Sequence, residues 1–231
     1  VGSDIDNNTV TMYRSSKKAE WEVLSKTPYG EGEIFPVNIS KDDSTIHIMD
    51  STKTSTYQLK EIDTNTGKTE VIFHHPKYDF YPQIIDDTVM GATFNPGYAQ
   101  AYWFETNDPL QNSILQAVQA FNGNIEIFDK KEIGLVALSK KKDKLIINVR
   151  DSVSSSKYYL YDLEKNQMKY LLTMWPEIDD AGLEAEVPFN FVNSDGVTIH
   201  GYYTRAKDQT EDQKAPMIVV PHGGPHARDT W

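Results

Sequence analysis

The chain repeats one block of short strands and polar turns after about a hundred residues. The first block is predicted to contain the strands Ile34–Ile39, Thr45–Met49, Thr56–Asp63 and Thr69–Phe73. The second block follows the same order with Ile133–Ser139, Lys144–Arg150, Lys157–Leu163 and Met168–Leu172. A unit of four strands that recurs every roughly 40 to 50 residues is typical of a β-propeller blade. We therefore predict a mainly β chain with four-stranded propeller blades, and an ordinary meander sheet is the alternative.

Other strands are predicted before and between the two blocks. They are Val10–Tyr13, Glu20–Leu24, Gln83–Ile85, Val89–Phe94 and Gln100–Phe104. The aromatic residues Tyr102, Trp103, Phe104 and Tyr158–Tyr161 could line a funnel that faces a peptide, but we favour packing between blades.

One segment departs from the strand pattern. Asn107-Asp108-Pro109 offers an N-cap followed by proline at the first helical position. Apolar side chains then recur at helical spacing at Leu110, Ile114, Leu115 and Val118, until Phe121-Asn122-Gly123 stops the run. We expect an amphipathic helix whose apolar stripe packs against the rim of the propeller.

Composition limits the classes of partner and the compartment. The 231 residues carry a net charge of −11, which argues against nucleic acid and anionic membranes as partners. No apolar run approaches the roughly 20 residues that span a bilayer, and no signal peptide is visible at the N-terminus, so we expect a soluble protein. The chain has no cysteine, which excludes disulfides and a thiol nucleophile. These features leave cytoplasm and periplasm equally open.

A boundary is predicted where the strand rhythm ends. Residues 1–173 are assigned to the C-terminal blades of a propeller, and the Pro-flanked acidic stretch 174–187 to a crossing segment. Residues 188–231 then change character, with strands at Phe189–Asn193 and Val197–Thr204 joined by a tight turn. Two antiparallel strands followed by a buried strand are how an α/β-hydrolase sheet begins.

The buried strand is predicted at Met217–Val220, and it opens into the loop Pro221-His222-Gly223-Gly224-Pro225. Acyl transfer needs backbone donors aimed at the developing oxyanion, and glycine lets the backbone approach a substrate closely. We predict that Gly224 donates its backbone N–H to an oxyanion and that Gly223 shapes the loop. An apolar strand cannot stand alone with unpaired edges. We therefore expect Met217–Val220 to pair with further hydrolase strands, with a second chain or with a copy of itself; finding it isolated and exposed would contradict the hydrolase sheet.

These motifs resemble the prolyl oligopeptidase family of serine peptidases, and most closely its acylaminoacyl-peptidase and dipeptidyl-peptidase-like bacterial members. The residues that carry the resemblance are Asn193–Tyr202, Pro216–Pro221 and His222–Trp231. The family implies an N-terminal propeller that restricts access to a C-terminal α/β-hydrolase domain, an oligopeptide substrate, and a Ser-Asp-His triad. It implies no metal and no organic cofactor. In the family the second glycine of His-Gly-Gly-Pro is an oxyanion donor, and Gly224 occupies that position.

The sequence departs from the family in one respect. No Gly-x-Ser-x-Gly occurs in residues 1–231, and the family's triad lies downstream of the oxyanion loop, so no triad residue can be assigned in this chain. We expect the fragment alone to be inactive and to depend on the remainder of the hydrolase domain. Two alternatives remain: an α/β-hydrolase that acts on esters, and a catalytically dead propeller that serves as a binding module.

A metal site was the remaining chemical interpretation of the terminal loop. His222, His226 and Asp229 lie close together in sequence, and imidazole and carboxylate groups suit zinc. We favour packing of the loop and surface pairing for these three residues, and we assign no metal ligand. Arg228 and Asp229 are expected to fix the loop by an ion pair or by backbone hydrogen bonds.

Overall fold

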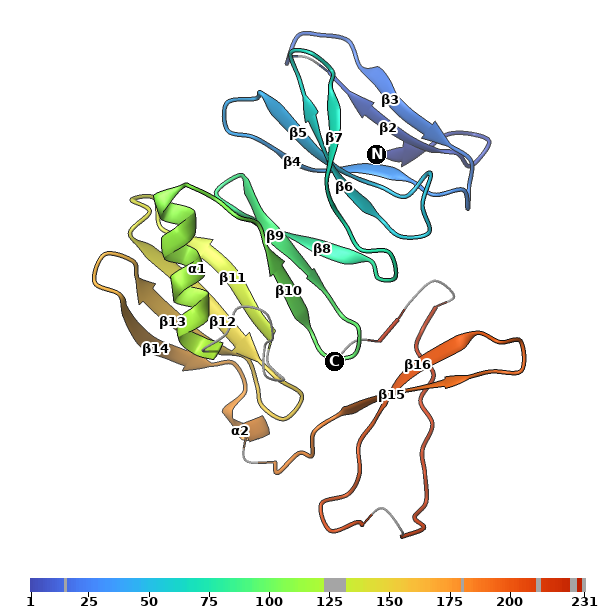
Figure 1. Cartoon of the computed structure of the whole chain (residues 1–231), viewed down its shortest axis with the longest axis vertical. Helices are drawn as coiled ribbons and strands as arrows, with labels where there is room; N and C mark the ends of the chain where they lie inside the picture. Colours follow the sequence, from blue (N-terminus) through green and yellow to red (C-terminus); the bar gives the residue numbers. More distant parts are fainter. Residues whose placement is uncertain (15, 123–131, 180, 211–212, 225–227, 230–231) are drawn as a thin grey trace. The chain divides into compact units, whose positions relative to one another are not determined.

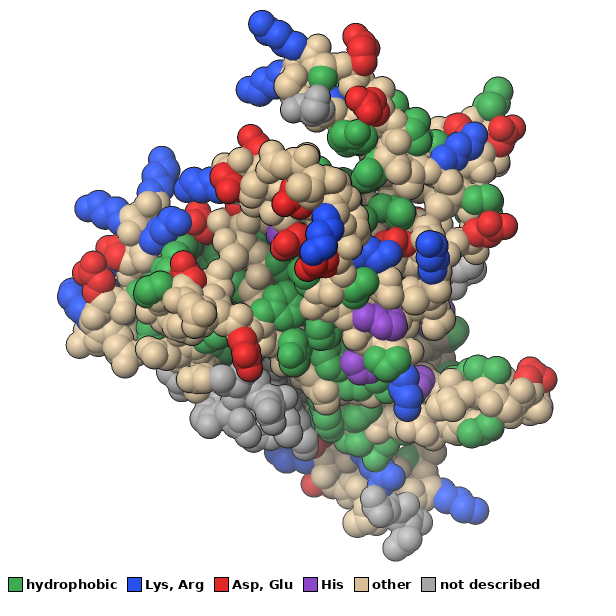
Figure 2. Space-filling model, turned by 45° about the horizontal axis from the view of Figure 1, so that its top comes forward, with side chains coloured by type: hydrophobic (Ala, Val, Ile, Leu, Met, Phe, Trp, Pro, Cys, Tyr) green, Lys and Arg blue, Asp and Glu red, His purple; other side chains and the backbone are tan. Residues whose placement is uncertain are grey.

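A computed structural model describes residues 1–14, 16–122, 132–179, 181–210, 213–224 and 228–229 of the chain. The chain divides into two compact units, Val1–Phe94 and Asn95–Trp231. Each unit consists mainly of antiparallel strands (Figure 1). Lysine, arginine and carboxylate side chains project outward and are interspersed over the visible face (Figure 2).

Unit 1 contains a three-stranded sheet, a four-stranded sheet and a hairpin. The three-stranded sheet has the order β1 (Gly2–Ser3), β2 (Thr9–Tyr13) and β3 (Glu22–Thr27). The four-stranded sheet has the order β4 (Ile34–Ile39), β5 (Thr45–Asp50), β6 (Gln58–Asp63) and β7 (Thr69–His74). The hairpin pairs β8 (Phe80–Ile85) with β9 (Thr88–Phe94).

Unit 2 begins with β10 (Gln100–Trp103) and helix α1 (Pro109–Asn122). Its four-stranded sheet has the order β11 (Glu132–Leu138), β12 (Lys144–Arg150), β13 (Lys157–Asp162) and β14 (Gln167–Thr173). The short helix α2 (Pro176–Asp179) precedes a hairpin of β15 (Val187–Val192) and β16 (Thr198–Tyr203). The two four-stranded sheets confirm the mainly β prediction.

The two four-stranded sheets repeat down to individual turn contacts. Between the first two strands, Ser40 N–H donates to the Thr45 carbonyl at 2.9 Å, and Ser139 N–H donates to the Lys144 carbonyl at 2.9 Å. The matching residues lie ninety-nine positions apart in both cases. Asp43 and Lys142, at the same offset, both have φ of 58°. A repeated turn with a shared backbone conformation supports two copies of one blade-like unit.

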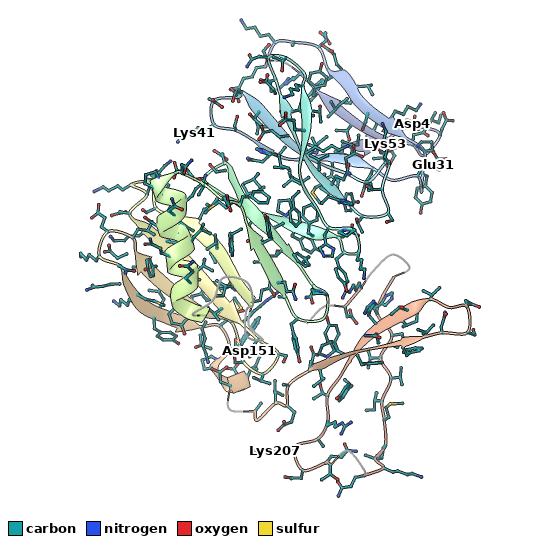
Figure 3. The ribbon with its side chains drawn as sticks, viewed as in Figure 1. Asp4, Glu31, Lys41, Lys53, Asp151 and Lys207 are labelled. Carbon is teal, nitrogen blue, oxygen red and sulfur yellow. The ribbon has the colours of Figure 1, made fainter. Side chains whose placement is uncertain are left out.

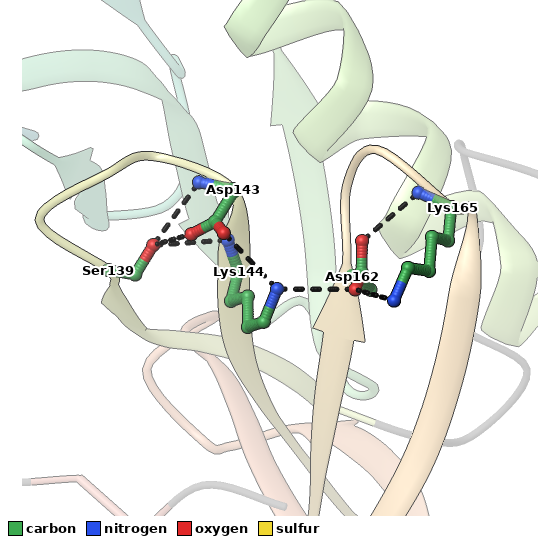
Figure 4. Close-up of polar contacts among 5 residues, drawn as sticks. All are labelled: Ser139, Asp143, Lys144, Asp162 and Lys165. Atoms are coloured by element: carbon green, nitrogen blue, oxygen red, sulfur yellow. Dashed lines mark hydrogen bonds and ion pairs between the residues drawn. The ribbon is translucent and has the colours of Figure 1, made fainter.

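Ion pairs are added to this turn in the second copy. The Ser139 hydroxyl donates to the Asp143 carboxylate at 2.6 Å, and Lys144 lies 3.2 Å from both Asp143 and Asp162 (Figure 4). Asp162 also accepts the Lys165 N–H at 3.0 Å. Thr45 occupies the place of Lys144 in the first copy and brings no charge there. The basic turn 140–144 therefore contributes to the stability of the sheet, because Lys144 links the turn between β11 and β12 to the turn between β13 and β14.

Alternating apolar side chains place the cores within the sheets. In unit 1 the most enclosed side chains include Met49 and Leu59, which face each other across β5 and β6. In unit 2, Leu145 and Ile147 are fully buried two residues apart on β12, as the two-residue period of a strand requires. Each fully buried side chain of this size contributes about 1.5–3 kcal/mol of transfer free energy.

Helix α1 starts as predicted. The Asp108 carboxylate accepts the Gln111 N–H at 2.9 Å, as an N-cap does, and Pro109 follows at the first helical position. Ile114, Ala117 and Val118 form its buried face. Leu115 is predicted on that face but is only half-buried, because Ala117 takes its place beside Ile114 and Val118 in the buried stripe.

The crossing segment contains a short helix that the sequence analysis did not predict. Within it, α2 places the Asp179 carboxylate 2.9 Å from the Ser155 N–H and 3.0 Å from the Lys157 ammonium. The Ser155 hydroxyl accepts the Trp175 N–H at 2.9 Å. The loop between β12 and β13 thus holds the segment that leaves β14. Asp151, labelled in Figure 3, stabilises that loop by accepting the Ser154 N–H at 2.7 Å.

Candidate active-site segment

The hairpin that precedes the glycine loop is built by its turn. Asn193 opens the turn, and its side-chain oxygen accepts the Asp195 and Val197 N–H groups at 3.0 and 2.9 Å. Gly196 has a φ of +79°, a left-handed conformation that favours glycine. The prediction of two strands joined by Ser194-Asp195-Gly196 is therefore confirmed. β15 and β16 pair in continuous register, from Val187 opposite Tyr203 to Val192 opposite Thr198.

One face of this hairpin is fixed to the start of unit 2. The Tyr202 hydroxyl donates to the Gly97 carbonyl at 2.6 Å and to the Asn95 side chain at 3.2 Å. Gly97 also lies against Pro188, since a Cβ built on it would be 3.1 Å from the proline ring. These contacts anchor the segment that leads to the glycine loop.

The opposite face of the hairpin carries apolar side chains in cross-strand positions. Phe189 and Phe191 have nearly parallel rings with centroids 6.4 Å apart, and Tyr203 packs beside Phe189 at 6.1 Å. Arg205 covers the Tyr203 ring at 5.3 Å. Phe189, Phe191 and Tyr203 are all partly exposed. Their exposed fractions of 41, 51 and 37 % show that the described residues cover this apolar face only in part.

The predicted buried strand Met217–Val220 is wrong for this structure. These four residues are 73–89 % exposed, and none of them belongs to a strand. A parallel strand is buried only when neighbouring strands and covering helices are present, and no described residue supplies them here. This exposure counts against the hydrolase sheet, which the described part of the chain does not show.

The two glycines of the predicted oxyanion loop are solvent-exposed. Gly223 has open space where a Cβ would stand, and the His222 Nδ1 atom lies 2.5 Å from the Gly223 carbonyl oxygen. Gly224 is exposed as well. Of the residues beyond it, Pro225 and His226 lie outside the described part of the chain. The segment thus offers accessible backbone at Gly224, and its role as an oxyanion donor stays a prediction.

Arg228 ties the far side of the loop to the same anchor as Tyr202. Its guanidinium donates to the Asn95 carbonyl at 2.7 Å. Both ends of the segment from β16 to the glycine loop therefore meet residues 95–97. Sequence reasoning expected Arg228 to fix the loop by a backbone hydrogen bond or an ion pair, and the structure gives it a backbone carbonyl.

The structure describes His222 and Asp229 but not His226, so it covers the residues considered as metal ligands only in part. No group of three His, Cys, Asp or Glu side chains suited to a metal occurs among the described residues, and His226 is not one of those residues. Within the same described ranges, no helix is long and apolar enough to cross a membrane.

Comparison with known proteins gives one curated relative and several structures of similar fold, whereas no family model matches the chain. The chain is 24 % identical to dipeptidyl aminopeptidase BIII from Pseudoxanthomonas mexicana over 232 residues, which is 95 % of this chain and 32 % of that protein. The chain thus spans about a third of the length of that curated relative.

The solved structures show the fold. Prolyl oligopeptidase B from Galerina marginata, in its apo form, superposes with a TM-score of 0.53 at 12 % identity and covers 90 % of this chain and 29 % of that one. The same enzyme bound to a 35mer hydrolysis and macrocyclization substrate gives a TM-score of 0.50 at 10 % identity, over 80 % of this chain and 25 % of that one.

The sheets and the sequence relationship point in the same direction. The chain combines antiparallel four-stranded sheets in repeated order with an Asn-Ser-Asp-Gly hairpin and a His-Gly-Gly-Pro sequence, and its fold is similar to that of prolyl oligopeptidase B. Together with the curated relative, they support the prediction of a prolyl-oligopeptidase-family peptidase fragment.

Proposed function

We propose that this chain is part of a serine peptidase that hydrolyses short peptides through an acyl-enzyme, with a propeller restricting access to the active site. The observation that carries the proposal is the relationship to dipeptidyl aminopeptidase BIII over 95 % of the chain. The exposure of Met217–Val220 is the observation that opposes it.

In the proposed reaction a serine outside residues 1–231 attacks the carbonyl carbon of the substrate. The serine proton passes to a histidine and then to the leaving amine as the peptide bond breaks, and water releases the acyl group. The carbonyl oxygen carries negative charge in each tetrahedral intermediate. We assign the Gly224 N–H as one donor to that oxygen and Gly223 as the residue that shapes its loop. Neither step requires a metal or an organic cofactor.

Kinetics of the full-length protein test this assignment. Gly224→Pro removes the backbone N–H and should lower kcat about 10²- to 10³-fold, the usual loss for one oxyanion donor. Gly224→Ala is the matched control, because it retains the N–H and should lose far less activity. Equal loss in the two variants would show that loop geometry, rather than the donor, is responsible.

Labelling separates this proposal from its two alternatives. A fluorophosphonate probe should label the full-length protein and leave the 231-residue chain unlabelled. Turnover of esters without turnover of amides would favour an esterase instead. Absence of labelling in the full-length protein would favour a propeller that only binds its partner.

A further inference from the structure

Helix α1 borders a cavity of about 1040 Å³ to which the proposed function gives no role. Trp103 and Leu115 contribute apolar surface to it. The remaining lining comes from one side of the helix and from the segment just before it, including Asn107, Asn112, Gln116 and Gln119. All of these residues belong to unit 2.

The lining disfavours anionic ligands and offers hydrogen bonds to uncharged ones. It contains no lysine, arginine or histidine, and Glu105 is its single charged residue. An anionic ligand would therefore find no counter-charge. The side-chain amides can both donate and accept hydrogen bonds. Of them, Asn112 uses one donor internally, toward the Thr106 carbonyl at 3.3 Å.

Trp103 provides the second observation. It is only 8 % exposed, and its indole nitrogen is buried without a hydrogen-bond partner among the described residues. An indole N–H can only donate, and a buried donor without an acceptor is costly. Because this nitrogen is enclosed, the ring must rotate before a ligand carbonyl in the cavity can supply the missing acceptor.

The spacing of the amides fits an extended peptide. Asn112 and Gln116 are four residues apart, which is about 6 Å along a helix axis. An extended strand presents backbone groups toward one side every second residue, about 6.6 Å apart. We propose that this cavity binds the main chain of an extended, uncharged peptide segment, whose successive carbonyl groups meet the Asn112 and Gln116 amides, with the Trp103 indole as a further donor. Binding here needs no catalytic serine, so it stands apart from the proposed peptidase activity.

The test is a titration of the isotopically labelled 231-residue chain with acetyl-tetraalanine amide, observed through indole N–H resonances. Trp103→Phe identifies the resonance of Trp103 by its disappearance. We expect that resonance to shift in a saturable way on addition of the peptide. Gln116→Ala should weaken binding about five- to tenfold, since one donor and one acceptor are lost.

Gln111→Ala is the matched control, because this glutamine lies on the same helix but does not line the cavity. Its affinity should equal that of the parent chain. No saturable shift of the Trp103 resonance, or equal weakening by both variants, would overturn the proposal. A tighter response to maltotriose than to the peptide would also overturn it, in favour of a saccharide. Peptide binding by a full-length protein that fails to label would leave this site intact and remove only the peptidase.

Discussion

The Asp50–Lys60 ion pair offers the sharpest test of how the first four-stranded sheet is stabilised. The two side chains are 8 % and 15 % exposed, and the ammonium nitrogen lies 2.6 Å from the carboxylate. Asp50 also accepts the Thr52 N–H at 2.8 Å and the Thr52 hydroxyl at 2.6 Å. Asp50→Asn keeps the shape and removes the charge, which leaves Lys60 enclosed without its counter-ion.

The magnitude follows from the burial of both partners. Breaking a buried pair by removing one charge costs about 3–5 kcal/mol, because the other charge stays desolvated. We expect Asp50→Asn and Lys60→Met each to lower the free energy of unfolding by about 3 kcal/mol or more. The double variant should be more stable than the sum of the two losses predicts, by about 1–3 kcal/mol.

The assay is urea unfolding followed by circular dichroism, with hydrogen exchange of residues 45–63 to locate the effect. Lys68→Met is the matched control, since Lys68 and Glu70 form a pair in the same sheet that is 72 % and 59 % exposed. It should change the free energy of unfolding by less than about 0.5 kcal/mol. Additive losses at Asp50 and Lys60 would refute the argument, because they would mean that the two charges do not interact.

The pH dependence of the free energy of unfolding gives a second test of the Asp50–Lys60 pair. Burial alone would raise the pKa of Asp50, but Lys60 and the Thr52 hydrogen bonds outweigh it and hold the pKa below its ordinary value of 3.8. The unfolded chain therefore takes up the proton first as the solution is acidified. The stability that the carboxylate contributes is complete above about pH 4–5 and is lost as the pH falls through the folded-state pKa. The difference between Asp50→Asn and the parent chain should shrink accordingly below pH 4.

Three further predictions concern single positions. Gly32→Ala should lower the free energy of unfolding by about 2–4 kcal/mol, because Gly32 has φ of +91° and a Cβ there would lie 2.6 Å from a backbone oxygen. Gly30→Ala, at a φ of +83° with open space around it, should lower it by only about 1 kcal/mol. Equal urea midpoints for the two variants would contradict this difference. Burial lowers the pKa of His47 despite Glu61 at 3.3 Å, so unit 1 should lose stability as the pH falls below about 6.5, and His47→Gln should flatten that part of the pH–stability curve. Tyr202→Phe removes the bond to a backbone carbonyl at 2.6 Å and should destabilise the β15–β16 hairpin by about 1 kcal/mol, seen as faster hydrogen exchange in that hairpin alone.

The strands were predictable because their signals are local. Ile34–Ile39 and Lys144–Arg150 agree with the structure at both ends, since alternating side chains and flanking turn residues mark each boundary. The N-cap at Asp108 is equally local. By contrast, the structure shifts the predicted strand Glu20–Leu24 to Glu22–Thr27, where pairing with β2 decides the boundary.

Features that depend on distant residues were missed. Helix α2 depends on Ser155 and Lys157, which lie about twenty positions before their partners. Its acidic, Pro-flanked sequence gave no sign of these partners. The cavity beside helix α1 could not be predicted either, because its lining combines the end of strand β10 with one side of the helix.

The segment that leads to the glycine loop has one part that local signals predict and one part that depends on distant residues. The hairpin before it forms through local contacts of Asn193 and Gly196, and its prediction is confirmed. The run Met217–Val220 has the composition of a buried strand, but composition supplies apolar side chains and not the neighbours that would cover them. An oxyanion donor depends on those same neighbours, because its N–H must point at a substrate oxygen held by the rest of the site. Removal of the Gly224 N–H in the full-length protein is therefore the decisive experiment, since the shape of the loop in this chain alone does not determine what that N–H meets.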